Sequence, residues 1–265
     1  LLLKPHRQGE DRGMNTQTSK AQDPLFQPYQ LKHLTLKNRL MISSHEPAYP
    51  EDGMPKDRYR AYHIERARAG VGLTMTAGSA SVSRDSPPVF NNVLAWKDEV
   101  VGWMRQLVNE CHDEGCAVMI QLTHLGRRTR WDKGDWLPVV SAGHAREPSH
   151  KAFPKKAEDW DIERLIADYA SAAQRMQQAG LDGIEIQAYG HLMDQFWSPL
   201  TNELEGPYGG ESLDIRLRFT METLEAIRAA CGPNFIVGVR YTGDEDLKGG
   251  LTNRDGLAIS HRLKD

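Results

Sequence analysis

Residues 181–219 read LDGIEIQAYGHLMDQFWSPLTNELEGPYGGESLDIRLRF. The stretch opens with an apolar run that is typical of a buried strand, and a long polar and aromatic loop follows it. A Gly-Gly turn at 209–210 then leads into an Arg-rich segment that predicts the start of a helix. A strand followed by a helix is the repeating unit of a parallel α/β sheet, so this stretch favours that fold class.

The same alternation of strand and helix runs along most of the chain. Apolar runs predict strands at 40–44, 71–77, 116–122, 182–187 and 235–240. Helices are expected near 56–69, 98–114, 161–179 and 213–230, with a last one from about residue 252. The segment before Gly180 shows the pattern best, because its apolar residues recur at helical spacing and the glycine follows as a C-cap. The sequence therefore predicts five strand–helix units, the fifth of them incomplete.

Five units leave two architectures open. An eight-stranded (β/α)8 barrel needs three further strands, whereas an open doubly wound sheet needs none. The loop after the first strand, SSHEPAYPEDGMP at 43–55, lacks the G-x-G-x-x-G pattern, which disfavours a dinucleotide-binding open sheet. Residues 1–23 are polar without a periodic apolar pattern, so we expect a disordered or non-native tail there and a single domain over 24–265.

Composition argues against several classes of partner. The net charge of −3 and the scattered basic residues give no nucleic-acid footprint. The apolar runs, such as 235–239, are far shorter than the ~20 residues that a membrane span needs. Cys111, Cys116 and Cys231 lack metal-site spacing, and reduced thiols in a cytoplasmic protein are a simpler interpretation than disulfides. We therefore expect no nucleic acid, membrane or metal as a partner.

Polar residues at the strand exits are the candidates for chemistry, since the active site of a barrel lies at the carboxyl ends of its strands. Gln121 makes either a structural hydrogen bond or a contact to a ring edge with alternating C=O and N–H groups, such as a flavin pyrimidine. Arg240 either pairs with a carboxylate such as Glu185 or stabilises negative charge on a bound cofactor. His191, just past the fourth strand, is either structural or catalytic.

Two further histidines and a long loop are weaker candidates. His45 and His124 follow the first and third strands. The loop at 127–160 is long enough for a lid and carries Trp131, Trp136 and Trp160. These rings either cage a cationic amine or simply pack the loop onto the barrel.

Several segments together resemble the old yellow enzyme family of FMN-dependent oxidoreductases. The start of the family is similar to PLFQPYQLKHLTLKNRL at 24–40, and its third strand is similar to AVMIQLTHLGRR at 117–128. Its fourth unit is similar to the first part of the stretch quoted above. EDGMPKDRY at 51–59 and THLGRR at 123–128 look most like the amine-oxidising branch, which includes trimethylamine dehydrogenase and the N-methylproline demethylases.

The resemblance implies a (β/α)8 TIM barrel, of which this chain holds about the first five units, and a bound FMN. By position, Ser44, His45, Ala77, Gln121 and Arg240 would hold the flavin ring. Arg240 would lie by N1 and C2=O, where negative charge gathers when the flavin is reduced.

The resemblance also implies that His191 and Tyr189 are the catalytic residues and face the substrate above the ring. Glu46 stands where trimethylamine dehydrogenase attaches its flavin through a cysteine, so FMN is expected to bind without a covalent bond. His191 falls where ene-reductases of the family carry a proton-donating tyrosine, which weakens an ene-reductase interpretation.

The reaction that the resemblance implies is oxidative N-demethylation of an N-methylated amine or amino acid. Hydride passes from the N-methyl group to flavin N5, and the iminium product hydrolyses to formaldehyde and the demethylated amine. The alternatives are an NAD(P)H-dependent ene-reductase or 2,4-dienoyl-CoA reductase, and an inactive fragment. Because the branch carries a 4Fe–4S cluster and FAD further along, we expect a C-terminally truncated sequence whose electron acceptor lies in the missing part. The oligomeric state stays open, with a homodimer as one option.

Overall fold

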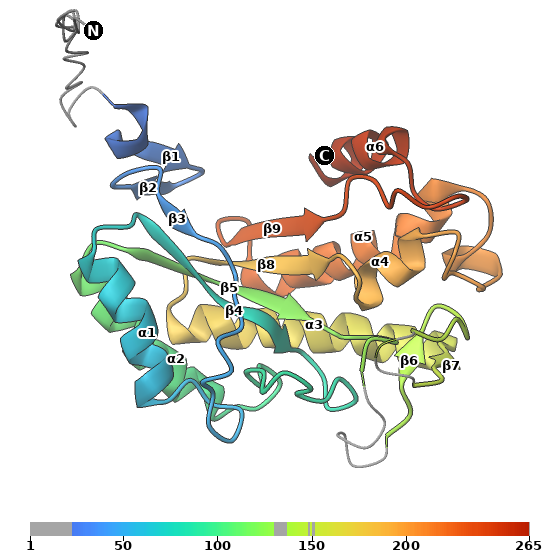
Figure 1. Cartoon of the computed structure of the whole chain (residues 1–265), viewed down its shortest axis with the longest axis horizontal. Helices are drawn as coiled ribbons and strands as arrows, with labels where there is room; N and C mark the ends of the chain where they lie inside the picture. The colour runs from blue at the N-terminus through green and yellow to red at the C-terminus, as the bar shows by residue number, and fades with distance from the viewer. Residues whose placement is uncertain (1–22, 130–136, 148, 150–151, 265) are drawn as a thin grey trace, which may run out of the picture.

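The computed structural model describes residues 23–129, 137–147, 149 and 152–264. A parallel sheet of five strands forms the centre of the described part, and its strands follow one another in chain order (Figure 1). These strands are β3 (Met41–Ile42), β4 (Leu73–Ser81), β5 (Ala117–Thr123), β8 (Gly183–Ala188) and β9 (Ile236–Tyr241). Strands in sequential order that are all parallel require a helical crossover between neighbours.

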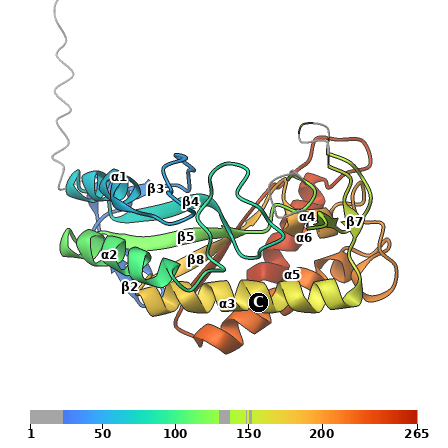
Figure 2. The same ribbon diagram turned by 90° about the horizontal axis from the view of Figure 1, so that it is seen from below.

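Helices supply these crossovers and cover one face of the sheet. They are α1 (Asp57–Arg68), α2 (Val100–Asp113), α3 (Asp159–Ala179), α5 (Leu213–Cys231) and α6 (Asn253–Lys264). Each packs against the next one along the chain, and Figure 2 shows α2, α3 and α5 along the same side of the strands. The prediction of a partial (β/α)8 barrel with about five units is confirmed, and the fifth unit includes its helix.

Smaller elements complete the described chain. A short 3-10 helix η1 (Pro24–Phe26) leads into the antiparallel hairpin of β1 (Tyr29–Leu31) and β2 (Leu34–Leu36). The pair of β6 (Val140–Ser141) and β7 (Lys155–Lys156) lies in the loop after β5. The loop after β8 holds α4 (Leu192–Trp197) and the 3-10 helix η3 (Gly206–Tyr208).

The structure departs from the sequence-based expectations at several of these elements. The first strand of the sheet spans two residues rather than 40–44, and β4 runs on to Ser81, past a register shift between Thr76 and Ala80. The loop expected after the fourth strand contains α4, whose six residues are too few to show a helical period. Asp194 stabilises its start by accepting hydrogen bonds from the N–H groups of Gly190 and His191.

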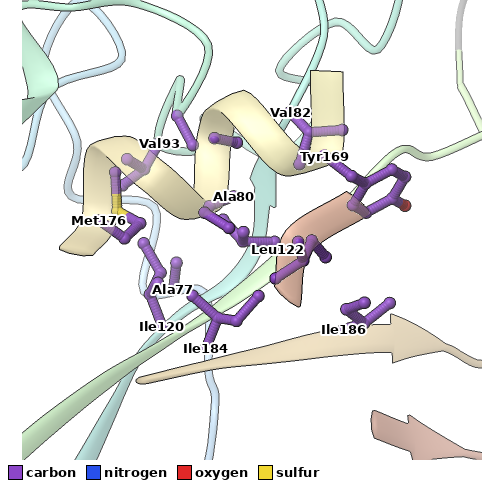
Figure 3. Packing of buried hydrophobic residues seen from close by; sticks show 14 of the residues in the cluster. Ala77, Ala80, Val82, Val93, Ile120, Leu122, Tyr169, Met176, Ile184 and Ile186 are labelled. Carbon is purple, nitrogen blue, oxygen red and sulfur yellow. The ribbon is translucent and has the colours of Figure 1, made fainter. Parts of the chain in front are cut away.

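Alternate residues of each strand separate the two faces of the sheet. The outward set packs under the helices: Ile120, Leu122, Ile184 and Ile186 lie against Tyr169 and Met176 of α3 (Figure 3). The inward set forms a second apolar cluster near the amino ends of the strands. Its members are Leu73, Met75, Ala117, Met119 and Ile236, together with Leu36 of β2. Because both faces are buried, the strands read in the sequence as nearly continuous apolar runs.

The cysteines and the length of the helices can be compared with the sequence-based expectations. All three cysteines lie within the described residues, and each is buried and unpaired. No helix in the described ranges is both long enough and apolar enough to cross a bilayer.

Candidate active site

Polar side chains replace the apolar cluster on the inward face as the strands approach their carboxyl ends. Gln121 and Glu185 are register partners on β5 and β8, and Arg240 on β9 pairs with Gln187. Gln121 lies two residues beyond Met119, and the two-residue period of a strand puts both on the inward face. The strand exits therefore carry a polar layer above an apolar one.

The inner polar cluster comprises Ser44, Gln121, Glu185, Tyr189 and Arg240. Gln121 Nε2 donates to Glu185 Oε1 at 2.6 Å and lies 3.4 Å from the Tyr189 hydroxyl. Arg240 Nη1 donates to Ser44 Oγ at 3.0 Å, and its guanidinium carbon lies 5.3 Å from the centre of the Tyr189 ring. Three predicted flavin-binding residues thus meet one predicted catalytic residue in a single cluster.

Glu185 is the central carboxylate of this cluster, although the sequence suggested it only as a partner for Arg240. Burial raises the pKa of Glu185, and hydrogen bonding by Gln121 together with the positive charge of Arg240 opposes that rise. Gln121 is fully buried, whereas Arg240 is exposed at the rim of the cluster. The signal that could have identified Glu185 is its polarity inside the apolar run of residues 183–188.

The register shift in β4 forms a second part of the site. Ala77 and Ser79 have left-handed φ values of 48° and 82°, which residues with a Cβ adopt only under local constraint. Ala77 N–H donates to the Tyr59 hydroxyl of α1 at 2.6 Å, and Ser79 Oγ donates to Gln187 Oε1 at 2.6 Å. The bulge is therefore held from both sides of the sheet.

The exit of β3 lies against this bulge. A Cβ on Gly78 would come 2.7 Å from the Glu46 backbone nitrogen, so the two segments are in close contact. Burial raises the pKa of Glu46 to about 8, even though its Oε1 accepts a hydrogen bond from the Ala48 N–H. Glu46 Oε2 is buried without a hydrogen-bond partner among the described residues, and the adjacent His45 is exposed.

His191 is buried at the start of α4, close to Tyr189. Its Nδ1 lies 3.0 Å from Thr123 Oγ1 at the end of β5. The rings of His191 and Tyr189 are nearly parallel, with centres 6.2 Å apart. The two residues predicted to face the substrate are therefore held together, and Tyr189 links them to the inner polar cluster.

His124 is fully buried and belongs to a separate network. Gly126 N–H donates to His124 Nδ1, so the proton is on Nε2, which donates to Asp85 at 3.0 Å. Although burial raises the pKa of Asp85, His124 and Arg164 hold it well below its usual range. This network fixes the loop after β5 onto α3, which indicates a structural role for His124.

Only one of the three tryptophans of the long loop lies within the described residues. Trp160 is exposed, donates to Glu158 at 2.9 Å and has the Lys155 ammonium 4.1 Å from its ring centre. Trp131 and Trp136 fall outside the described residues.

Comparison with known proteins identifies the family. Residues 24–263 match the NADH:flavin oxidoreductase / NADH oxidase family, a range that includes all seven predicted site residues. The chain belongs to this family. The resemblance that the sequence motifs suggested is confirmed, whereas the roles of the seven site residues stay predictions.

Two relatives show which members of the family this chain is similar to in sequence. The chain is 68% identical over 243 residues to a probable N-methylproline demethylase of Rhizobium meliloti (strain 1021), covering 92% of this chain and 36% of that protein. It is 42% identical over 243 residues to the N,N-dimethylglycine/sarcosine dehydrogenase of Chromohalobacter salexigens, covering 91% and 35%. The chain thus spans about a third of the length of these relatives.

Solved structures share the fold. The structure of morphinone reductase in complex with tetrahydroNAD superimposes with a TM-score of 0.81 at 26% identity, covering 91% of this chain and 69% of that one.

The described residues fit the ring edge of the FMN that the family uses. A flavin pyrimidine alternates C=O and N–H groups, and the Gln121 amide supplies both a donor and an acceptor on the inward face. Arg240 and Ser44 add a cation and a hydroxyl, and the unpaired Glu46 Oε2 lies at the neighbouring strand exit. The Ala77 N–H already donates to the Tyr59 hydroxyl, so this backbone donor is not available to the ring.

Proposed function

We propose that this chain provides the flavin-ring and substrate contacts of an FMN-dependent oxidoreductase that demethylates an N-methylated amine or amino acid. The observation that carries the proposal is the 68% identity to a probable N-methylproline demethylase across a chain whose strand exits form the inner polar cluster. The 42% identity to an N,N-dimethylglycine/sarcosine dehydrogenase supports the same chemistry.

In this proposal one set of residues binds the cofactor and another set contacts the substrate. When bound, FMN would supply the hydride acceptor for oxidation of the N-methyl carbon. Gln121, Ser44 and Arg240 hold the pyrimidine edge, with Arg240 placing positive charge against it. His45 and Ala77 contact the ring from the first and second strand exits. FMN is held without a covalent bond, because Glu46 offers no thiol.

Tyr189 and His191 face the substrate. Their rings stack on each other, and Tyr189 also contacts Gln121 in the inner polar cluster. The Thr123 hydroxyl and the start of α4 fix the orientation of His191. The substrate nitrogen must be neutral to assist hydride loss, and these two side chains orient it or keep it neutral.

We extend the proposal to the whole protein. Electrons taken from the substrate need an acceptor, and a 4Fe–4S cluster and FAD held outside residues 1–265 would supply the path. The protein is proposed to be cytoplasmic, which fits its unpaired, buried cysteines, and to form a homodimer.

The experiment is an anaerobic titration of the flavin-loaded protein. An N-methylated amino acid such as N-methylproline should bleach the visible absorbance of the flavin, and formaldehyde should appear in an equal amount. A flavin that stays yellow with every N-methylated amine would contradict demethylation. A preparation that never retains FMN would favour the alternative of an inactive fragment.

An NAD(P)H-dependent ene-reductase or dienoyl-CoA reductase is the second candidate. It is favoured by the fold shared with morphinone reductase in its tetrahydroNAD complex. NADPH oxidation that depends on an added enone, with no bleaching by N-methylated amines, would establish it instead.

A further inference from the structure

We propose that Arg128 binds the carboxylate of the substrate, so that this site takes N-methylated amino acids in preference to amines without a carboxylate. The inference rests on the proposed function and adds a substrate class and a specificity residue to it. Arg128 lies in the loop after β5, next to Arg127 and close to the start of α4.

The guanidinium of Arg128 has no partner in the described chain. Its side chain is partly buried, and Nε is excluded from solvent without a hydrogen bond. No described carboxylate lies within ion-pair distance of it. By contrast, Arg127 donates to the Ala145 carbonyl, and Arg164 pairs with Asp85 and Asp168. A partly buried guanidinium without an acceptor is unfavourable, so an anionic group is expected to complete it.

The position of Arg128 connects it to the substrate side of the site. A Cβ on Gly190 would come 3.0 Å from Arg128 Nη1, so the guanidinium lies against the backbone between Tyr189 and His191. Gly190 has a φ of 69°, a conformation that side chains rarely adopt, and the loop therefore leaves this space to the arginine. The nearby Asp194 is occupied by the N–H groups of Gly190 and His191.

The chemistry of the group suits a carboxylate. The planar guanidinium presents parallel N–H donors that match the two oxygens of a carboxylate. A substrate with its carboxylate on Arg128 would be anchored beside the stacked rings of Tyr189 and His191. Such a contact holds the substrate and the transition state alike, so it would lower KM without changing the rate at saturation.

The test compares paired ligands that differ only in the carboxylate. Arg128→Gln and Arg128→Lys are made in the flavin-loaded protein, with the exposed Arg254→Gln as a control. Binding of proline and of pyrrolidine is measured by calorimetry, which needs no turnover. Flavin reduction by N-methylproline and by N-methylpyrrolidine is followed anaerobically.

Arg128→Gln should weaken proline binding and raise KM for N-methylproline by roughly 10–100-fold, as expected for loss of a charge-assisted pair. The rate at saturation and the behaviour of pyrrolidine and N-methylpyrrolidine should change little. Arg128→Lys should recover part of the affinity for proline, because lysine keeps the positive charge but lacks the parallel N–H donors of a guanidinium. Thermal unfolding of both variants shows whether they fold as the wild type does.

The role of Arg128 would be overturned if Arg128→Gln lowered the affinity equally for ligands with and without a carboxylate. It would also be overturned if the affinity for neither kind of ligand fell. Failure of wild-type protein to bind proline would overturn it too. If N-methylproline does not bleach the wild-type flavin but proline binding still depends on Arg128, the proposed reaction fails and the carboxylate site stands.

Discussion

The two faces of the sheet use alternate residues of the same strands and differ in chemistry. On the face toward the helices, Ile120 and Leu122 of β5 are fully buried among apolar side chains (Figure 3). On the other face, Gln121 between them is equally buried but bonds to Glu185. The helix-packed face is set by apolar volume, whereas the inner face tolerates buried polar groups because they satisfy one another.

The largest expected effect comes from damaging the helix-packed face. Ile120→Ala should lower the free energy of unfolding by about 2–5 kcal/mol, because the deletion leaves a cavity in a close-packed core. Chemical denaturation measures the change, and FMN affinity well below the transition should stay as in the wild type. The control Ile215→Ala, on an exposed position of α5, should stay within about 0.5 kcal/mol.

Glu46 tests whether a carboxyl near the inner face is buried in its neutral form. Its pKa rises from 4.5 to about 8 on folding, so its contribution to stability is complete below pH 4.5 and is lost as the pH rises to 8. Over that range the free energy of unfolding should fall by up to ~1.4 kcal/mol per pH unit relative to Glu46→Gln. Denaturation curves from pH 5 to 9 measure this difference.

The exposed Glu51→Gln is the matched control for that series. Its stability should follow the wild type at every pH. If the curves for Glu46→Gln and wild type run parallel across the same range, the carboxyl of Glu46 is ionised in the folded protein at neutral pH, and the contrast between the two faces weakens.

Arg240→Gln separates function from stability on the inner face. The side chain is exposed at the rim, so the free energy of unfolding should change little. FMN affinity should fall by roughly 10–100-fold, as for the loss of a hydrogen bond to a charged group. Fluorescence quenching of FMN measures the dissociation constant, with Arg254→Gln as the control. An unchanged constant would assign Arg240 to its bond with Ser44 alone.

The sequence predicted the strands and helices well because each unit repeats one pattern of apolar residues. It also identified Gln121 and Arg240, since a polar residue at the end of an apolar run stands out at a strand exit. It did not predict the bulge in β4, because left-handed φ values at Ala77 and Ser79 follow from tertiary contacts rather than from residue type. The assignment of flavin-binding and catalytic roles to these residues stays a prediction.

Other parts of the site depend on contacts between distant residues. Glu185 and Gln121 are 64 positions apart, and Arg128 meets Gly190 only because the loops after β5 and β8 fold against each other. No local pattern carries this information. The raised pKa of Glu46 has the same origin, since it follows from burial against the bulge in β4.

Tyr59→Phe gives the smallest expected effect on FMN affinity and tests whether the two faces are coupled. The Tyr59 hydroxyl on α1 is the acceptor for the Ala77 N–H, and both groups are buried. Removing it leaves that N–H unpaired and should lower the free energy of unfolding by about 1–3 kcal/mol. Tyr62→Phe, at a half-buried position on the same helix, is the control and should change stability by less. Because Ala77 is a predicted flavin contact, FMN affinity should also weaken, by less than about tenfold. A variant that loses stability but keeps its FMN affinity would show that the helix layer supports the bulge without setting the geometry of the flavin site.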